Sequence, residues 1–169
     1  MNATAAAKVH GAATLRVEDL TPEQLQAELK ALEGPLGPPD SMPVDVLSIR
    51  RMALAVEDLD PIHYDEAAAR ARGYRGIVAP WPLLWLVFFN CREAPLTFSF
   101  GKATLHGGDS YEFHEPLVAG DTVTVSAVVS ETSVKQGKAG AMGVVVTRRE
   151  FRNQLGQLCA VMHTTNLRR

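Results

Sequence analysis

Cysteine is scarce in this sequence, and its two cysteines stand far apart. Cys91 and Cys159 are the only thiols among 169 residues, and neither belongs to a Cys-x-x-Cys pair. Isolated cysteines predict neither a disulfide framework nor a tetrahedral zinc site, and they are typical of a reducing compartment. We therefore expect no metal ion, a fold stabilised by its apolar core, and a cytoplasmic location.

The sequence also lacks an excess of charge and a long apolar segment. Its 17 lysines and arginines against 19 aspartates and glutamates give a net charge of −2, which disfavours a nucleic acid as partner. The longest apolar run, Trp81–Phe89, is too short to cross a membrane, which takes about 20 residues. No basic head is followed by an apolar block near the start, so a secretory signal is not predicted. We expect no membrane partner.

The first 40 residues are expected to lie outside the main domain. Thr21–Gln24 has the pattern of a capping box, with a threonine cap, a proline in the first helical position and a glutamine near the end of the first turn. It predicts a short helix from Pro22 to about Glu33, which a run of glycines and prolines ends. We assign residues 1–40 to an N-terminal arm with this helix, and residues 41–169 to one compact domain.

Helices are predicted in the first part of this domain. Apolar residues fall on one side of a helical wheel in Val44–Val56, and polar residues on the other. A polar helix is expected at about residues 65–72, because Pro61 separates it from the preceding one. The run Trp81–Phe89 is apolar on every side, which predicts a helix enclosed on most of its circumference.

The second half of the domain has the alternation of a β-sheet. Strands are predicted at residues 110–114, 122–130, 141–152 and 157–167, with a hairpin turn at Asn153–Gly156. The expected apolar faces are Val123, Val125, Ala127 and Val129 in the second strand, and Met142, Val144 and Val146 in the third. A curved antiparallel sheet wrapped around the apolar helix buries the apolar strand faces and the helix together. The fold class is therefore α+β.

The segment Asp58–His63 brings together groups that can activate water. It reads Asp-Leu-Asp-Pro-Ile-His and places two carboxylates and an imidazole at the end of a predicted helix. A carboxylate and a neutral imidazole that share one water can take a proton from it and return one elsewhere, which typically accelerates a reaction about 10²–10⁴-fold. The same residues also fit a turn in which aspartates cap backbone N–H groups. Spacing alone leaves both interpretations open.

Asp58–Asp65 resembles the hydratase motif Asp-x-Asn-Pro-[Ile/Leu]-His-x-Asp of the MaoC-like dehydratases and (R)-specific enoyl-CoA hydratases. The resemblance extends over most of residues 44–169. Residues 73–80 are similar to the segment that leads into the family's central helix. Residues 105–122 resemble its first strands, most of all in the branch that forms the N-terminal domain of larger MaoC-like dehydratases. The resemblance implies a hot-dog fold, in which a curved antiparallel sheet wraps around a central apolar helix.

The resemblance also implies a hydro-lyase. Asp58 and His63 would be catalytic and would hold the water that is added across the C2–C3 double bond of an acyl thioester, or removed on elimination. Trp81 stands where the family usually has a glycine whose backbone N–H stabilises the thioester oxyanion, so we assign that contact to the backbone N–H of Trp81. The substrate is then a coenzyme A or acyl-carrier thioester. No cofactor is needed, and a homodimer or a heterodimer with another hot-dog subunit is expected.

Three departures from the family pattern concern the same site. Asp60 replaces an asparagine, and its second negative charge near Asp58 is expected to raise the pKa of one carboxyl group. Residues 79–81 read Ala-Pro-Trp in place of Ala-His-Gly. The central helix also carries large aromatic residues where many hydratases have small ones, which fits a short or unusual acyl pocket or plain core packing. These residues are Trp85, Phe88 and Phe89.

Two other functions stay open on the sequence. Asp60 and the Pro-Trp pair also fit a non-catalytic, substrate-binding subunit of a heterodimeric dehydratase, and a hot-dog thioesterase would direct a carboxylate at the thioester carbonyl. His114 with Glu112 is a second candidate pair on one strand face. Several cations fit contacts with coenzyme A phosphates, or a solvated strand edge, equally well. They are Lys135, Lys138, Arg148, Arg149 and Arg152.

Overall fold

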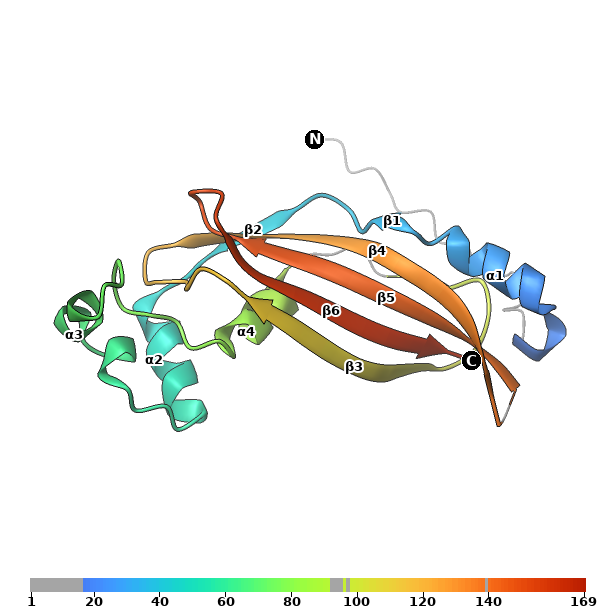
Figure 1. Cartoon of the computed structure of the whole chain (residues 1–169), viewed down its shortest axis with the longest axis horizontal. Helices are drawn as coiled ribbons and strands as arrows, with labels where there is room; N and C mark the ends of the chain where they lie inside the picture. Colours follow the sequence, from blue (N-terminus) through green and yellow to red (C-terminus); the bar gives the residue numbers. More distant parts are fainter. Residues whose placement is uncertain (1–16, 92–95, 97, 139) are drawn as a thin grey trace, which may run out of the picture.

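The chain is built on one long antiparallel sheet (Figure 1). A computed structural model describes residues 17–91, 96, 98–138 and 140–169. The helices are the 3-10 turn η1 (Val17–Asp19), α1 (Pro22–Lys30), α2 (Val46–Ala55), the 3-10 turn η2 (Pro61–His63), α3 (Glu66–Ala71) and α4 (Leu83–Asn90). The strands are β1 (Gly34–Pro35), β2 (Asp40–Pro43), β3 (Thr104–Phe113), β4 (Thr122–Gly137), β5 (Gly140–Arg152) and β6 (Leu158–Arg168). The α+β class is confirmed.

The strand order makes β3 an edge strand of the sheet. The order is β1-β4-β5-β6-β3, and β2 also pairs with β4. The predicted turn Asn153–Gly156 joins β5 and β6, and Gly156 adopts a φ of 76°, which favours glycine. Figure 1 shows α2, α3 and α4 gathered at one end of the long sheet and α1 at the other. The edge strand β3 pairs with β6 along its length, and its last residues lie at the end that carries α4.

Helix α4 packs one of its sides against the sheet. Leu83, Leu84 and Val87 are buried in a core cluster that includes Phe151 of β5. The opposite side is open, and Phe89 is 72% exposed. The prediction that this helix is enclosed on most of its circumference is thus wrong for the single chain, because a one-layer sheet covers only one side of a helix.

The face of β4 is confirmed and that of β5 is corrected. All four predicted apolar residues of β4 are buried, from Val123 at 0% exposure to Ala127 at 7%. In β5, Val144 is buried as predicted, at 5% exposure, but Met142 and Val146 are only partly buried, while Val145 and Phe151 enter the core clusters. The run of three valines at residues 144–146 puts apolar side chains on both faces, so alternation alone does not identify the face that meets the helices.

Helix α1 begins with the predicted capping box. The Thr21 hydroxyl accepts from the Gln24 N–H at 3.2 Å, and the Gln24 side chain accepts from the Thr21 N–H at 2.9 Å. Leu25 and Leu29 are fully buried against the sheet in a second apolar cluster. Residues 1–16 of the expected arm lie outside the described residues. The division of the chain at residue 40 stays a prediction.

Two further observations concern only the described residues. No helix among them is long and apolar enough to span a membrane. The same residues contain no group of three histidine, cysteine, aspartate or glutamate side chains placed to hold a metal ion.

Candidate active site

Asp58 and His63 lie in direct contact just after α2. Oδ2 of Asp58 is 3.0 Å from Nε2 of His63. Asp60 caps the 3-10 turn η2 and Pro61 opens it, so the chain reverses and brings the imidazole back beside Asp58. The His63 side chain is 5% exposed and that of Asp58 43%. The pair thus consists of an inner imidazole and an outer carboxylate that water can reach.

The other ring nitrogen of His63 fixes its tautomer. Nδ1 lies 2.7 Å from the carbonyl oxygen of Val78. Because a carbonyl oxygen only accepts, Nδ1 must carry a proton and donate it. The contact between Nε2 and Asp58 then needs one further proton, which the two groups share. A pair that holds one proton in place and exchanges another is suited to acid–base chemistry on water.

Val78 is itself held by backbone hydrogen bonds from two sides. Its N–H donates to the carbonyl of Ile62 at 2.9 Å. It also forms an isolated antiparallel bridge with Val118, in the turn that precedes β4. The carbonyl that orients His63 is therefore fixed by segments that are distant in sequence.

A buried carboxylate holds the turn that pairs with Val78. Asp121 is 1% exposed, and its oxygens accept from the Arg75 guanidinium at 3.0 and 2.8 Å and from the Val118 N–H at 2.9 Å. Burial alone would raise the pKa of Asp121, but the hydrogen bonds from Arg75, Val118 and Gln154 outweigh it and lower that pKa. The charged pair thereby stabilises the backbone that positions His63.

Asp60, the second carboxylate of the motif, is paired with a cation. Its Oδ2 lies 2.6 Å from the Arg72 guanidinium, and its Oδ1 accepts from the Ile62 N–H at 3.2 Å. The bond from Arg72, followed by that N–H, holds the pKa of Asp60 below its usual value. The expectation of a raised pKa is wrong for Asp60, because Arg72 compensates its negative charge.

Asp58 and His63 line an open cavity of ≈ 730 Å³. Trp81, just before α4, lines the same cavity, and its ring packs at a tilt against that of Phe113 with 4.3 Å between centroids. Trp81 stands between two prolines, which have no N–H. Within the described part of the chain, its own N–H donates to no backbone carbonyl. The oxyanion role of this N–H stays a prediction.

Residues 35–163 match a family model described as "FAS1-like, dehydratase domain region". The chain belongs to this dehydratase family. One relative, a UPF0336 protein of Streptomyces avermitilis, is 27% identical over 125 residues, which cover 71% of this chain and 80% of that protein. A probable enoyl-CoA hydratase alpha subunit of Thermomonospora curvata is 31% identical over 143 residues, which cover 75% of this chain but 45% of the relative.

Solved structures agree on the fold of this dehydratase-family chain. The ChsH1-ChsH2 complex from Mycobacterium tuberculosis superposes with a TM-score of 0.69 at 24% identity, covering 90% of this chain and 96% of the other. The (R)-hydratase from A. caviae gives 0.61 at 20% identity, with coverages of 80% and 94%. The prediction of a MaoC-like hot-dog protein is confirmed, and α4 is its central helix.

The other sequence candidates of the dehydratase-family chain are dispersed. His114 lines the Asp58–His63 cavity, whereas its proposed partner Glu112 does not. Arg149 lines a second cavity, and the arginines at 148 and 152 pair with a glutamate of the same strand. Arg149 therefore lies in a different setting from Arg148 and Arg152.

Sequence reasoning missed three partners of the motif. The Tyr64 hydroxyl donates to the backbone carbonyl of Asp58 at 2.9 Å, and this tyrosine stands inside the motif, where its polar ring was a visible signal. Arg72 is one of several nearby arginines, and the sequence does not show which of them pairs with Asp60. Val78 acts through its backbone, so no side-chain pattern marks it.

Proposed function

We propose that this dehydratase-family protein is a hydro-lyase that adds water to, or removes water from, the C2–C3 bond of an acyl thioester. The observation that carries the proposal is the contact of Asp58 with His63 at 3.0 Å, with the second ring nitrogen of His63 tied to the backbone. The pair opens on a cavity of ≈ 730 Å³, which has room for the thioester end of a substrate. A turn that only caps backbone groups does not require such a cavity.

In the hydration direction the pair handles two protons. A water bound in the cavity beside Asp58 and His63 gives a proton to the pair as its oxygen bonds to C3. The double-bond electrons move onto the thioester carbonyl, and the pair returns a proton to C2 when that carbonyl re-forms. The pair ends with the protons it began with, and the product is a 3-hydroxyacyl thioester. Elimination is the same path in reverse.

We assign the stabilisation of the negative charge on the thioester oxygen to the backbone N–H of Trp81. Trp81 stands directly before Pro82, the N-cap residue of α4, and lines the same cavity as Asp58 and His63. A backbone donor aimed at a developing oxyanion typically contributes about 10²–10³-fold in rate. Replacing the side chain at this position leaves the N–H in place, so the family's glycine is not required for the bond itself.

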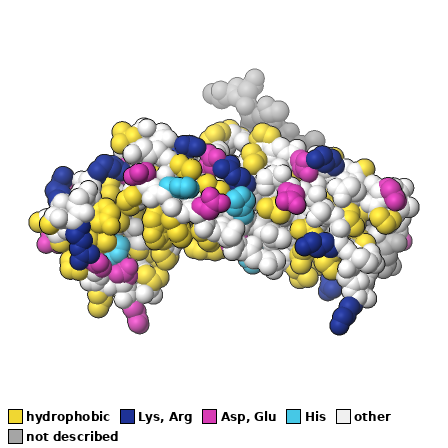
Figure 2. All heavy atoms as spheres, viewed as in Figure 1, with side chains coloured by type: hydrophobic (Ala, Val, Ile, Leu, Met, Phe, Trp, Pro, Cys, Tyr) yellow, Lys and Arg dark blue, Asp and Glu magenta, His cyan; other side chains and the backbone are white. Residues whose placement is uncertain are grey.

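We infer that the active unit contains two hot-dog subunits. Strand β3 ends the sheet and exposes most of its residues, and a long exposed edge strand favours pairing with another chain. Phe89 and Leu105 are 72% and 44% exposed, and Figure 2 shows apolar side chains gathered over the region of α4. The second subunit is another copy of this chain or a related hot-dog protein.

A non-catalytic subunit is the second candidate function. It is favoured by the solved complexes named ChsH1-ChsH2 and HadBC, each of which combines two proteins, and by the relative named an alpha subunit. In that case the protein binds an enoyl thioester and a different subunit supplies the acid–base pair.

The test is hydration of crotonyl-CoA and of longer enoyl-CoA thioesters by the purified protein. Loss of the enoyl-thioester absorbance and release of free coenzyme A thiol are measured together. We expect loss of absorbance without thiol release, and a His163→Ala control that keeps the wild-type rate, because His163 lies on β6 away from the cavity. A wild-type protein that purifies as a two-subunit assembly of this chain and binds enoyl-CoA but converts none is the non-catalytic subunit, and thiol release indicates a thioesterase. Either result contradicts the hydro-lyase.

A further inference from the structure

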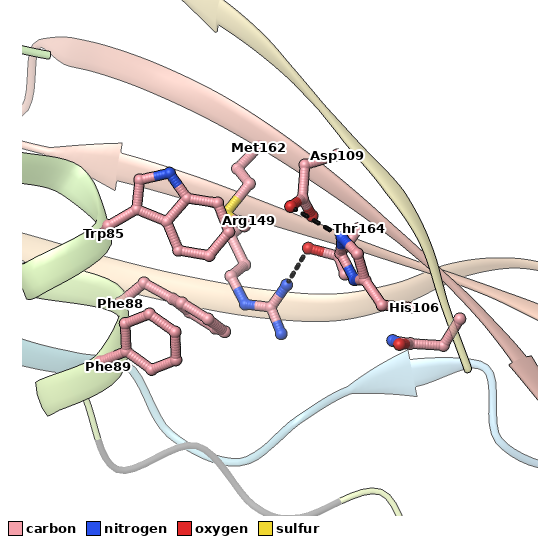
Figure 3. Close-up of a pocket in the computed structure, with 9 residues that line it drawn as sticks. Trp85, Phe88, Phe89, His106, Asp109, Arg149, Met162 and Thr164 are labelled. Carbon is pink, nitrogen blue, oxygen red and sulfur yellow. Dashed lines mark hydrogen bonds and ion pairs between the residues drawn. The ribbon is translucent and has the colours of Figure 1, made fainter. Parts of the chain in front are cut away.

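A second cavity of ≈ 380 Å³ lies between α4 and the sheet, and Figure 3 shows the side chains that surround it. One wall consists of the aromatic rings of Trp85, Phe88 and Phe89 from α4. The other wall carries polar groups from three strands, among them Asp109 of β3 and Arg149 of β5. The cavity is thus apolar on the helix side and polar on the sheet side.

Asp109 lines this cavity and has one buried oxygen without a hydrogen-bond partner in the described residues. Its side chain is 9% exposed, and its Oδ2 lies 3.2 Å from Nε2 of His106. Its Oδ1 is buried and has no hydrogen-bond partner in the described part of the chain. A buried acceptor without a donor costs free energy, so this atom indicates a bound group that donates a hydrogen bond.

Arg149 places a positive charge on the same cavity. It is 6% exposed, donates to the Thr164 hydroxyl at 3.1 Å, and its guanidinium carbon lies 4.5 Å from the centroid of the Phe88 ring. Figure 3 shows the guanidinium between that ring and the strand carrying Thr164. A bound group in this cavity therefore meets a carboxylate and a guanidinium together.

A row of aromatic rings connects the two cavities. Trp81 lines the first cavity and packs at a tilt against Phe113 at 4.3 Å between centroids. Phe113 stacks on Tyr111 at 5.7 Å, and Tyr111 lies 6.1 Å from Trp85, which lines the second cavity. An acyl chain that extends from the first cavity to the second would lie along this row of rings.

We propose that the second cavity binds the far end of the acyl group, and that this end carries an uncharged hydroxyl that donates to Oδ1 of Asp109. The proposal rests on the proposed hydro-lyase function and narrows its substrate class. A terminal carboxylate would meet Asp109 as well as Arg149, and a terminal ammonium would meet Arg149 as well as Asp109, so each charged end has one attraction and one repulsion. A terminal methyl would leave Oδ1 of Asp109 without a donor. A hydroxyl donates and accepts without adding a charge.

The test compares acyl-CoA thioesters that differ only at the far end. Binding of saturated ω-hydroxyoctanoyl-CoA and ω-hydroxydodecanoyl-CoA to the wild-type protein is measured by calorimetry against octanoyl-CoA and dodecanoyl-CoA, and against thioesters ending in a carboxylate or an ammonium. At one length or the other, we expect the hydroxyl to improve affinity about tenfold over the methyl, because a site built to bond a hydroxyl discriminates against its absence. Equal affinity for hydroxyl and methyl at both lengths, or a preference for either charged end, overturns the proposal.

Variants of β3 connect this preference to Asp109. We expect Asp109→Leu to remove the preference for the hydroxyl, while Ser110→Ala, an exposed neighbour on the same strand, retains it. If Asp109→Leu keeps the preference, or changes only the mass of the assembly, the oxygen serves another purpose and the proposal fails. Because binding is measured with saturated thioesters, this result does not depend on turnover. Failure of the hydro-lyase is instead seen as the absence of crotonyl-CoA hydration.

Discussion

Nδ1 of His63 lies 2.7 Å from the carbonyl oxygen of Val78, so the orientation of the proposed acid–base imidazole depends on the backbone that holds Val78. That backbone pairs with Val118, whose N–H is bound by the buried carboxylate of Asp121. The pair of Asp121 with Arg75 thus supports His63 although neither residue lines the cavity.

Arg75→Ala is expected to destabilise the protein far more than Arg72→Ala. The first substitution leaves a carboxylate that is 1% exposed without its cation, which costs about 3 kcal/mol. The second removes an ion pair whose side chains are 52% and 34% exposed, and such pairs contribute little. Urea unfolding of both variants measures the difference in free energy of unfolding. Equal losses would show that Arg75 does not support the fold through Asp121.

Asp121→Asn is expected to weaken the pH dependence of the free energy of unfolding at acidic pH. The pKa of Asp121 is lowered in the folded protein, so below its usual value of 3.8 the unfolded chain binds more protons than the folded chain. The stability supplied by this carboxylate is therefore present above pH 3.8 and is lost as the pH falls through the lowered pKa. Urea unfolding at several pH values tests this. Parallel pH profiles for wild type and Asp121→Asn would contradict it.

Several of these relationships were inaccessible to sequence reasoning for physical reasons. Asp58 and His63 were found because a local turn brings them together within one motif. The tautomer of His63 depends on a backbone carbonyl 15 residues away, and only the tertiary fold supplies it. The pKa of Asp60 depends on which nearby arginine reaches it. The core face of β5 was missed because Val144, Val145 and Val146 give both faces the same character.

Tyr111→Phe is expected to stabilise the protein, most of all at alkaline pH. The Tyr111 hydroxyl is buried without a hydrogen-bond partner in the described residues, and removing such a group typically gains about 1 kcal/mol. Burial, and then the charge of Asp109, raises the pKa of Tyr111 to about 12. Between pH 10 and 12 the unfolded chain ionises first, so wild type loses stability there and the phenylalanine variant loses less. Urea unfolding at neutral and alkaline pH measures the difference in free energy of unfolding between the two proteins. A difference that does not grow above pH 10 would contradict this prediction.

Leu105→Lys is expected to weaken subunit association. Leu105 lies on the edge strand β3 and is 44% exposed, so a lysine there places charge where a second chain is proposed to pair. Leu155→Lys is the matched control, because Leu155 is 62% exposed in the β5–β6 turn. Light scattering should give a two-subunit mass for wild type and Leu155→Lys, and a lower mass for Leu105→Lys at the same concentration. A wild-type monomer that hydrates crotonyl-CoA would exclude the two-subunit requirement.

The central claim is that Asp58 and His63 act together on one water. If so, combining Asp58→Asn with His63→Ala should cost little more than either change alone, because the two residues act as a unit. Asp60→Asn is the matched carboxylate control, since asparagine is an equally good N-cap and Asp60 is paired with Arg72.

The most direct measurement is kcat/KM for hydration of crotonyl-CoA by Asp58→Asn and Asp60→Asn, side by side with wild type. The account predicts a loss of about 10²–10⁴-fold for Asp58→Asn and a near wild-type value for Asp60→Asn. An Asp58→Asn protein that retains the wild-type rate, or an equal loss in both variants, would contradict it.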